Sequence, residues 1–334
     1  MRADARAPPA VLRDASDARA PCPACGLPVD AQRAANDELR MRRCPSCHTL
    51  CAFPFPSAAE LAAYYNSDYS VIDAGLTPRR RANWTPLLET AERLAGGRNG
   101  LEIGSSTGAF LRLAGERGWS MIGVELDDRA RTQHARTSPD IPVSSTLEAA
   151  RAAGLPPVDA VWILHTVEHL SDPCAALREA IDALAPGGVL IATTPNGASL
   201  ECRLLGPLWE WWTPPAHLAL FSPRGARLLF ERAGLEIVSI ETRRGDSSGA
   251  AANVALAPAR LLRRSVAGRE RQRSSVSAWS QRMAQVLNVA YDPLSRPLRA
   301  WLYRRYQGPE LLLVARRLRC GRTGCEPGPS AERR

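Results

Sequence analysis

Residues 101–110 read LEIGSSTGAF, and the fold is predicted from this stretch. A short apolar run containing Glu102 leads into Gly104 and Gly108, which are separated by small residues. Glycine-rich turns after a strand commonly bind phosphate through backbone N–H groups. A carboxylate at Glu102 would repel a phosphate, and the G-x-G-x-x-G spacing of dinucleotide sites is not met. The turn therefore suits a ligand other than ATP or a dinucleotide.

From residue 99 onward, strand-like segments alternate with helix-like segments. Strands are expected at 99–104, 119–126, 141–145, 158–166, 187–195 and 235–243, and helices at 107–118, 127–137, 172–184 and 222–234. A last strand at 309–317 follows after a long detour. This order predicts an α/β fold with a doubly wound, mostly parallel, seven-stranded sheet.

Two acidic residues mark the carboxyl edge of this expected sheet, Glu102 in the first strand and Glu125 at the end of the second. Ligands of open α/β sheets bind at that edge, and an acid placed like Glu125 accepts the hydroxyls of a ribose. A ligand with a ribose, no phosphate and a positive charge fits both residues. S-adenosylmethionine, with its sulfonium and ammonium groups, is such a ligand.

The motifs resemble those of class I S-adenosylmethionine-dependent methyltransferases. LEIGSSTG resembles their first motif and VELDD their ribose-binding segment, and Ser105 stands where the family usually has cysteine or glycine. VDAVWILHTVEHLSDP, LREAIDALAPGGVLIATTPN and HLALFSPRGARLLFERAGLEIV are similar to a subgroup with ubiquinone-pathway O-methyltransferases and enzymes of polysaccharide and secondary-metabolite clusters. The resemblance covers residues 20–245 and 308–318. It implies a Rossmann-like fold, this cofactor and methyl transfer.

The same resemblance implies which residues hold the cofactor. The methionine part would contact the first motif, the ribose the second strand, and the adenine the segment after the third strand. These residues are Glu102, Gly104, Ser106 and Gly108 for the methionine part, Glu125 for the ribose, and Thr146 and Leu147 for the adenine.

Four cysteines near the N-terminus have the spacing of a metal site. Cys22 and Cys25 form one C-x-x-C pair, Cys44 and Cys47 another, and eighteen residues lie between the pairs. Two such knuckles present four thiolates tetrahedrally to zinc. Four protein ligands leave no open position for a substrate, so we expect a structural zinc ribbon. Beyond the ribbon, Ser57 and Glu60 form a capping box that predicts a short helix over 57–69. The ribbon and the following FPFPSAAELAAYYNSDY resemble the N-terminal module of cluster-encoded methyltransferases.

Candidate catalytic residues cluster in HTVEHL, where His165, Glu168 and His169 follow the fourth strand. Three roles are open for them: fixing the pocket wall, acting as a general base, or holding a divalent metal. Ubiquinone-pathway members of the resembling subgroup carry acidic residues here for a metal, and His165 departs from their usual glutamate. His217, which follows Trp209, Trp211 and Trp212, is the second base candidate. These tryptophans would either stack over the acceptor or pack as a lid.

Charge is distributed unevenly along the chain. All 43 basic residues are arginine, and residues 243–334 carry 19 of them against 6 acidic residues. An amphipathic stripe from Trp279 to Ala290 lies in this part and suits a membrane surface, a dimer partner or the chain's own domain. No apolar run reaches the roughly 20 residues that span a bilayer. We expect a cytoplasmic protein with peripheral contact at the inner membrane surface or a homodimer contact through residues 245–307.

The expected organisation has seven parts. They are a disordered tail (1–19), the zinc ribbon (20–55), a helical linker (56–95), the methyltransferase core (96–244), a basic helical insertion (245–307), the last core strand (308–319) and a second disordered tail (320–334). The favoured function is methyl transfer to oxygen of a small-molecule or glycan acceptor. An RNA methyltransferase and a non-catalytic cofactor-binding module are the alternatives. The ribbon is not notably basic and lacks the stacking aromatics of an RNA reader, which argues against nucleic acid.

Overall fold

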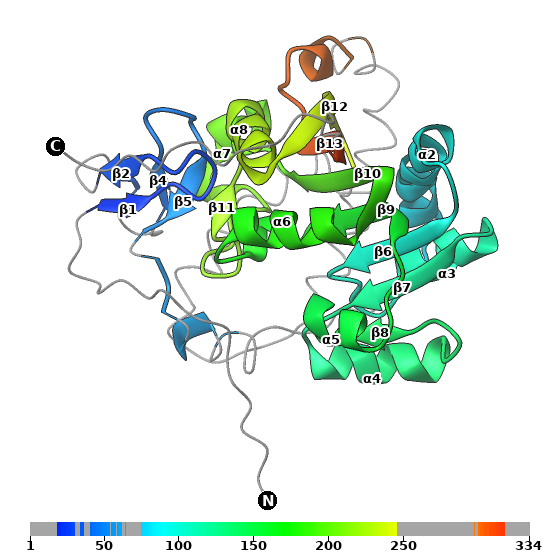
Figure 1. Ribbon diagram of the computed structural model, residues 1–334. Coiled ribbons are helices and arrows are strands. Elements are labelled where there is room, and N and C mark those ends of the chain that lie inside the picture. Colours follow the sequence, from blue (N-terminus) through cyan, green and yellow to red (C-terminus); the bar gives the residue numbers. More distant parts are fainter. Residues whose placement is uncertain are drawn as a thin grey trace, which may run out of the picture.

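A computed structural model describes residues 19–30, 34–36, 41–53, 55–57, 59–61, 64, 75–245, 297 and 300–317. Its main feature is a seven-stranded sheet in the order β12-β13-β10-β9-β6-β7-β8 (Figure 1). β13 runs antiparallel to both of its neighbours, and the pairs among β10, β9, β6, β7 and β8 are parallel. The strands are β6 (Asn99–Ile103), β7 (Ser120–Val124), β8 (Val143–Ser144), β9 (Val158–Leu164), β10 (Leu184–Pro195), β12 (Leu235–Arg243) and β13 (Glu310–Arg317). The predicted fold class is confirmed.

Helices lie on both faces of this sheet (Figure 1). They are α2 (Pro78–Leu94), α3 (Ala109–Glu116), α4 (Asp128–Thr137), α5 (Leu147–Ala152), α6 (Pro173–Ala183), α7 (Leu200–Leu205) and α8 (Pro223–Ala233). Side-chain oxygens cap several N-termini, such as Asp127 at α4, Asp172 at α6 and Ser222 at α8. These caps satisfy amide groups that lack an intrahelical partner. α5 was not expected from the sequence, and β8 is shorter than its expected range.

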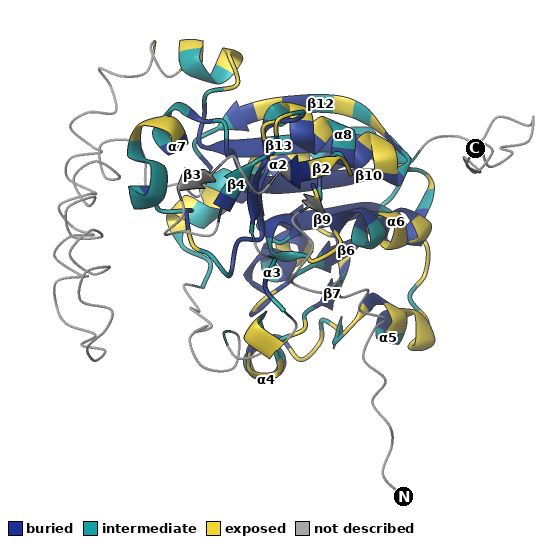
Figure 2. Ribbon diagram, turned by 90° about the vertical axis from the view of Figure 1, so that its left-hand side faces the viewer, coloured by how far each residue is buried: buried dark blue, intermediate teal, exposed yellow. Residues whose placement is uncertain are grey.

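The central strand β9 is buried on both faces, as is usual for a strand between two parallel neighbours (Figure 2). Its residues alternate between two apolar clusters, with Val161 and Ile163 in one and Trp162 in the other. Trp162 packs against Phe110 of α3, with ring centroids 5.4 Å apart. The buried residues of α2, among them Trp84, complete this second cluster. The sheet is therefore held rigidly from both sides, and its carboxyl edge is a fixed platform.

The cysteine-containing segment forms two small sheets. β1 (Arg19–Pro21) pairs with β2 (Pro28–Asp30), while β3 (Ala34–Asn36), β4 (Met41–Arg43) and β5 (Leu50–Ala52) form a second sheet. A strand from the core, β11 (Ala219–Leu220), joins the edge of that second sheet at β5. The expected capping box is also present, because Ser57 and Glu60 each bind the other's backbone N–H. The ribbon is thus continuous with the core rather than tethered beside it.

Some sequence predictions fall outside the residues that the structure describes. These are both tails, the stripe from Trp279 to Ala290, and most of the helix expected at 57–69 and of the basic insertion. Among the described residues, no helix combines the length and apolarity needed to cross a bilayer. The expected membrane-surface or dimer contact therefore stays a prediction.

Candidate functional site

The glycine turn after β6 is shaped by close contacts. Gly104 and Gly108 have φ angles of +81° and +76°, in the left-handed region that favours glycine. A Cβ added to Gly104 would lie 2.1 Å from Oγ1 of Thr166, and one added to Gly108 would lie 2.0 Å from Nδ1 of His134. The turn therefore needs glycine for both its conformation and its packing. It brings the predicted residue Ser106 to the surface at the carboxyl edge of the sheet.

Glu102 is a buried carboxylate without a compensating partner. Its side chain is 4% exposed, and its Oε2 has no hydrogen-bond partner among the described residues. Burial, and secondarily the charge of Glu125, raises the pKa of Glu102 well above its usual value. A buried polar atom left unpaired is costly, so the predicted contact of Glu102 with a ligand would relieve this cost. A cationic group at this edge would supply the missing partner.

Glu125 is held in a fixed orientation beside the same turn. Its carboxylate accepts hydrogen bonds from the backbone N–H groups of Ser106 and Asp127, both at 2.8 Å. Leu126 follows directly and is 79% exposed. Such an apolar side chain, beside the acid that is predicted to bind the ribose, suits the face of an aromatic base. Leu126 was missed from the sequence, although its position directly after an acid at the carboxyl edge was a usable signal.

The two residues predicted near the adenine have different environments. Thr146 is exposed and caps α5, accepting a hydrogen bond from the Ala149 N–H at 3.0 Å. Leu147 is buried in the main apolar cluster. The structure therefore places Thr146 at the surface and Leu147 in the core, and their contact with a cofactor stays a prediction.

His165 lies between two buried carboxylates on the other side of the carboxyl edge. Its Nε2 is 2.8 Å from Oε2 of Glu310, and its Nδ1 is 3.4 Å from Oε1 of Glu168. Burial alone would lower the pKa of His165, but the charges of Glu310 and Glu168 outweigh it and raise this pKa well above its usual value. His165 is thus a fixed imidazolium. This state disfavours the general-base role that the sequence left open for it.

Glu310, the first residue of β13, was missed from the sequence. Its side chain is 1% exposed and accepts a hydrogen bond from Nε of Arg243 at 2.6 Å, besides facing His165. Glu168, the second carboxylate, accepts from the Thr194 hydroxyl at 3.0 Å. An acidic residue opening the apolar run ELLLV was the available signal, but nothing local places it beside His165.

His169 and His217 have similar environments. Nδ1 of His169 is 2.9 Å from the Ala216 carbonyl oxygen, and Nδ1 of His217 is 2.5 Å from that of Trp211. These contacts assign the proton to Nδ1, so Nε2 carries the lone pair in each neutral ring. Burial, with a smaller contribution from His169, lowers the pKa of His217 to about 4. His217 is therefore neutral at pH 7. Its low pKa makes it a weak base, and the nearby charge of Glu168 is the main influence that favours a proton on its ring.

Glu168, His169 and His217 could hold a metal, because their ligand atoms all lie within 4.8 Å of one another. Backbone carbonyls that orient the Nδ1 of a histidine are typical of metal ligands. His217 takes the place that the sequence assigned to His165 in this group. The same residues can equally provide a base and its supports, so both roles stay open.

The three tryptophans before His217 have two different environments. Trp211 stacks on His165, with ring centroids 4.9 Å apart and planes 13° apart. Trp209 and Trp212 are buried in an apolar cluster with Met41 and Leu50 of the ribbon. Trp211 therefore lies beside the candidate catalytic residues, whereas the other two tryptophans pack against the ribbon, and a role of Trp211 as an aromatic wall of the site stays a prediction.

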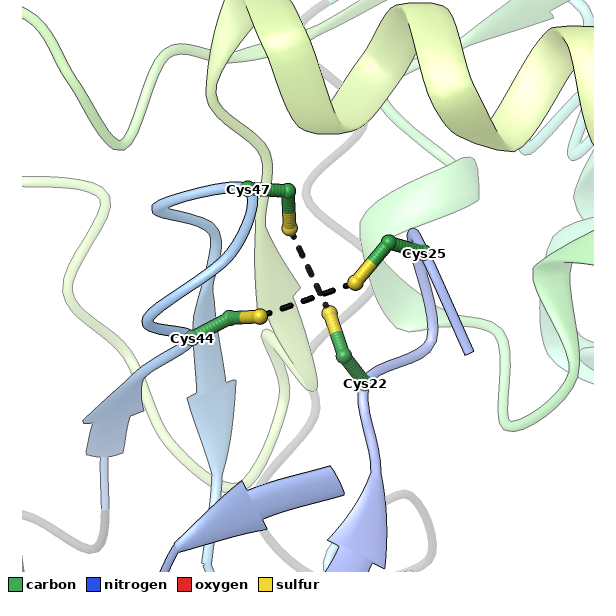
Figure 3. Close-up of side chains that lie close together, drawn as sticks. All are labelled: Cys22, Cys25, Cys44 and Cys47. Atoms are coloured by element: carbon green, nitrogen blue, oxygen red, sulfur yellow. Dashed lines mark hydrogen bonds between the residues drawn. The ribbon is translucent and has the colours of Figure 1, made fainter. Parts of the chain in front are cut away.

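The predicted zinc ligands converge on one point (Figure 3). The sulfur atoms of Cys22 and Cys47 are 3.6 Å apart, as are those of Cys25 and Cys44. A ZnS4 tetrahedron with Zn–S bonds of about 2.3 Å has edges of about 3.8 Å, so the spacing fits zinc. Burial raises the pKa of Cys25 to about 11, so a cation is needed for these thiols to ionise together. Zinc binding itself stays a prediction.

Comparisons with known proteins indicate a methyltransferase domain. A family model described as "Methyltransferase domain" matches residues 77–240. A ubiquinone biosynthesis O-methyltransferase of Dinoroseobacter shibae is 27% identical over 148 residues, which are 41% of this chain and 60% of that protein. One from Caulobacter sp. is 32% identical over 123 residues, which are 34% of this chain and 49% of that protein. The matched region thus spans less than two thirds of these relatives.

Solved structures were also found to be similar. A SAM dependent methyltransferase from Archaeoglobus fulgidus is 20% identical, with a TM-score of 0.44, and the match covers 76% of this chain and 98% of that one. The CcbJ methyltransferase from Streptomyces caelestis is 16% identical, with a TM-score of 0.43, covering 75% of this chain and 100% of that one. The family model matches just under half of this chain, and together with the seven-stranded sheet it supports a class I S-adenosylmethionine-dependent methyltransferase domain over residues 77–240.

Proposed function

We propose that this protein transfers a methyl group from S-adenosylmethionine to an oxygen atom of a small-molecule or glycan acceptor. The observation that carries the cofactor assignment is the pair Glu102 and Glu125 around a glycine turn that would repel a phosphate. Relatives that carry the name ubiquinone biosynthesis O-methyltransferase support oxygen as the accepting atom. The acceptor class rests on the resemblance described for the sequence.

The residues at the cofactor edge fit the parts of this ligand. Glu102 offers its unpaired Oε2 to the ammonium group. Glu125, already oriented by two backbone N–H groups, has lone pairs left for the ribose hydroxyls. Leu126 offers an apolar surface to the adenine ring. When bound, the cofactor supplies an electrophilic methyl group on a positively charged sulfur.

His217 is the residue we assign as general base. An acceptor hydroxyl loses its proton as the new carbon–oxygen bond forms and the carbon–sulfur bond breaks, and a nearby base lowers that barrier. His217 is neutral, its Nδ1 proton is bound by a carbonyl, and its Nε2 can take up the proton. His165, held as an imidazolium by Glu168 and Glu310, instead fixes the position of Trp211, which stacks on its ring.

A divalent metal at Glu168, His169 and His217 is the alternative way to activate the hydroxyl. The convergence of their ligand atoms favours it. A bound metal would lower the pKa of a coordinated hydroxyl, and the base would then be dispensable. Metal analysis of the purified protein separates the two: about one metal per chain indicates the ribbon alone, and about two indicate this second site.

Two measurements test the proposal. Calorimetry should show micromolar-range binding of S-adenosylmethionine, and a screen over phenols, sugar nucleotides and RNA should detect S-adenosylhomocysteine release with one of the first two classes. Turnover confined to RNA would move the assignment to the alternative substrate class. Cofactor binding without turnover on any class would favour the non-catalytic module, and absence of cofactor binding would refute the proposal.

A further inference from the structure

The ribbon and the acceptor side of the site share one β-ladder. β5 pairs antiparallel with β11, with Cys51 opposite Ala219 and Leu50 opposite Leu220. The Ala52 N–H also donates to the Leu218 carbonyl at 2.8 Å, which extends the ladder by one residue. Figure 1 shows β11, from the middle of the chain, lying beside β5. The strand that follows His217 is therefore an edge strand of the ribbon's sheet.

This ladder continues directly into the loop that carries the candidate catalytic residues. The Leu218 N–H donates to the carbonyl of Glu168 at 2.8 Å, and the Ala216 carbonyl faces Nδ1 of His169 at 2.9 Å. Residues 216–218 thus lie between β5 on one side and Glu168 and His169 on the other. A shift of β5 would be passed to His217 through two backbone hydrogen bonds.

The cysteine knuckles are tied to the same region through α8. The Ser222 hydroxyl donates to the carbonyl of Cys47 while accepting from the Gly225 N–H at 2.9 Å, where it caps α8. Nη1 of Arg232, at the other end of that helix, donates to the Ala24 carbonyl in the first knuckle at 2.8 Å. Both knuckles therefore dock on α8, which begins three residues after Leu220.

Apolar packing connects the ribbon to Trp211 as well. Met41 and Leu50 of the ribbon are fully buried with Trp209 and Trp212, and Trp211 packs against this cluster while stacking on His165. β4 and β5 have three residues each. Strands this short are not stable by themselves and need an external constraint. A metal at the knuckles is the constraint that the four cysteines provide.

We propose that zinc at Cys22, Cys25, Cys44 and Cys47 positions the side of the active site that would face the acceptor. We call this side the acceptor wall, and it consists of Trp211, His217 and the loop with Glu168. The metal fixes the knuckles and β5, β5 fixes β11, and β11 fixes His217, Trp211 and the loop with Glu168. The cofactor edge around Glu102 and Glu125 meets these segments where Gly104 packs against Thr166, but its own position is set by the pairing of β6 with β7 and β9. The proposal rests on the proposed function in taking residues 165–169 and 209–220 as the acceptor side.

Hydrogen-exchange mass spectrometry of the full chain, with and without removal of zinc by a chelator, tests this coupling. We expect zinc removal to reduce amide protection at 41–53, 165–171 and 209–222, while 99–126 stays protected and affinity for S-adenosylmethionine changes less than about threefold. Cys44→Ser should reproduce this pattern, and Cys174→Ser, a buried thiol of α6, should not. Loss of protection confined to 19–53, or spread evenly over the chain, would overturn the proposal.

Coupling must also work in the reverse direction, because linkage between two sites is reciprocal. Ser222→Ala removes the hydroxyl that binds the Cys47 carbonyl, so in equilibrium competition with a chromophoric chelator it should bind zinc at least about fivefold more weakly than the native chain. Thr77→Ala removes an equivalent cap from α2, far from the ribbon in sequence, and should leave the zinc affinity unchanged. Equal zinc affinity of Ser222→Ala and the native chain would overturn the coupling. Failure of cofactor binding with coupling intact would refute the proposed function alone.

Discussion

The buried carboxylates on the two sides of the sheet's carboxyl edge differ in how they are paired. At the cofactor edge, Glu102 is buried without a partner for Oε2, and its pKa is raised. At the acceptor side, Glu310 is bound by Arg243 and His165. Glu168 accepts a hydrogen bond from Thr194 through Oε2, while its Oε1 makes no hydrogen bond among the described residues and forms an ion pair at 3.4 Å with His165. An unpaired buried acid destabilises the empty protein, whereas a paired one fixes geometry. Under the proposed function, the first side would be completed by the cofactor, and the second would be rigid before the acceptor binds.

The largest expected effect is the loss of turnover when His217, the residue we assign as general base, is replaced. His217→Ala should lower turnover on the true acceptor by about 10²–10⁴-fold, the usual contribution of a positioned base. Cofactor affinity should change by less than about threefold, because His217 belongs to the acceptor side. Steady-state rates and calorimetry on the same preparation measure both quantities. Wild-type turnover in this variant would exclude His217 and favour transfer by positioning or by a metal.

Glu310→Gln tests the rigidity of the acceptor side. Removing one partner of a buried charge pair costs about 3–5 kcal/mol of unfolding free energy. The folded pKa of His165 is raised, so its contribution is complete below the unfolded pKa and is lost as pH rises through the folded value. The stability difference between the native chain and the variant should therefore be largest in mild acid and shrink at alkaline pH. Urea denaturation across this pH range measures it, and a difference that does not depend on pH would contradict the charged pair.

Parts of this comparison could be predicted from the sequence and others could not. The cofactor edge is local, because Glu102, the glycine turn and Glu125 lie within one strand–helix–strand unit. The acceptor side joins distant segments: Glu310 meets His165 across 145 positions. The antiparallel pairing of β5 with β11 leaves no periodic signal, since both strands are very short. Trp209 and Trp212 look identical to Trp211 in sequence, and their burial against the ribbon separates them.

At the cofactor edge, Glu125→Ala should weaken binding of S-adenosylmethionine about 10–100-fold. Hydrogen bonds to a charged group contribute about 1.5–3 kcal/mol, and Glu125 also orients the turn through the Ser106 N–H. Isothermal titration calorimetry measures the change, with His165→Ala and His217→Ala as comparison variants that should bind nearly normally. Equal binding by Glu125→Ala and the native chain would contradict the ribose-binding role.

The smallest expected effect comes from Glu102→Gln, and its sign matters more than its size. Because the folded pKa of Glu102 is raised, the native chain loses stability as pH rises from the unfolded value of about 4.3 toward the folded one. The neutral glutamine avoids this loss, so the empty variant should match the native chain near pH 4 and be more stable by about 1 kcal/mol at neutral pH. Its affinity for the cofactor should fall, because the partner of the ammonium group has lost its charge. Thermal unfolding with and without S-adenosylmethionine shows both changes. A variant that is less stable than the native chain at neutral pH would mean that Glu102 is a structural residue, and the contrast between the two sides would disappear.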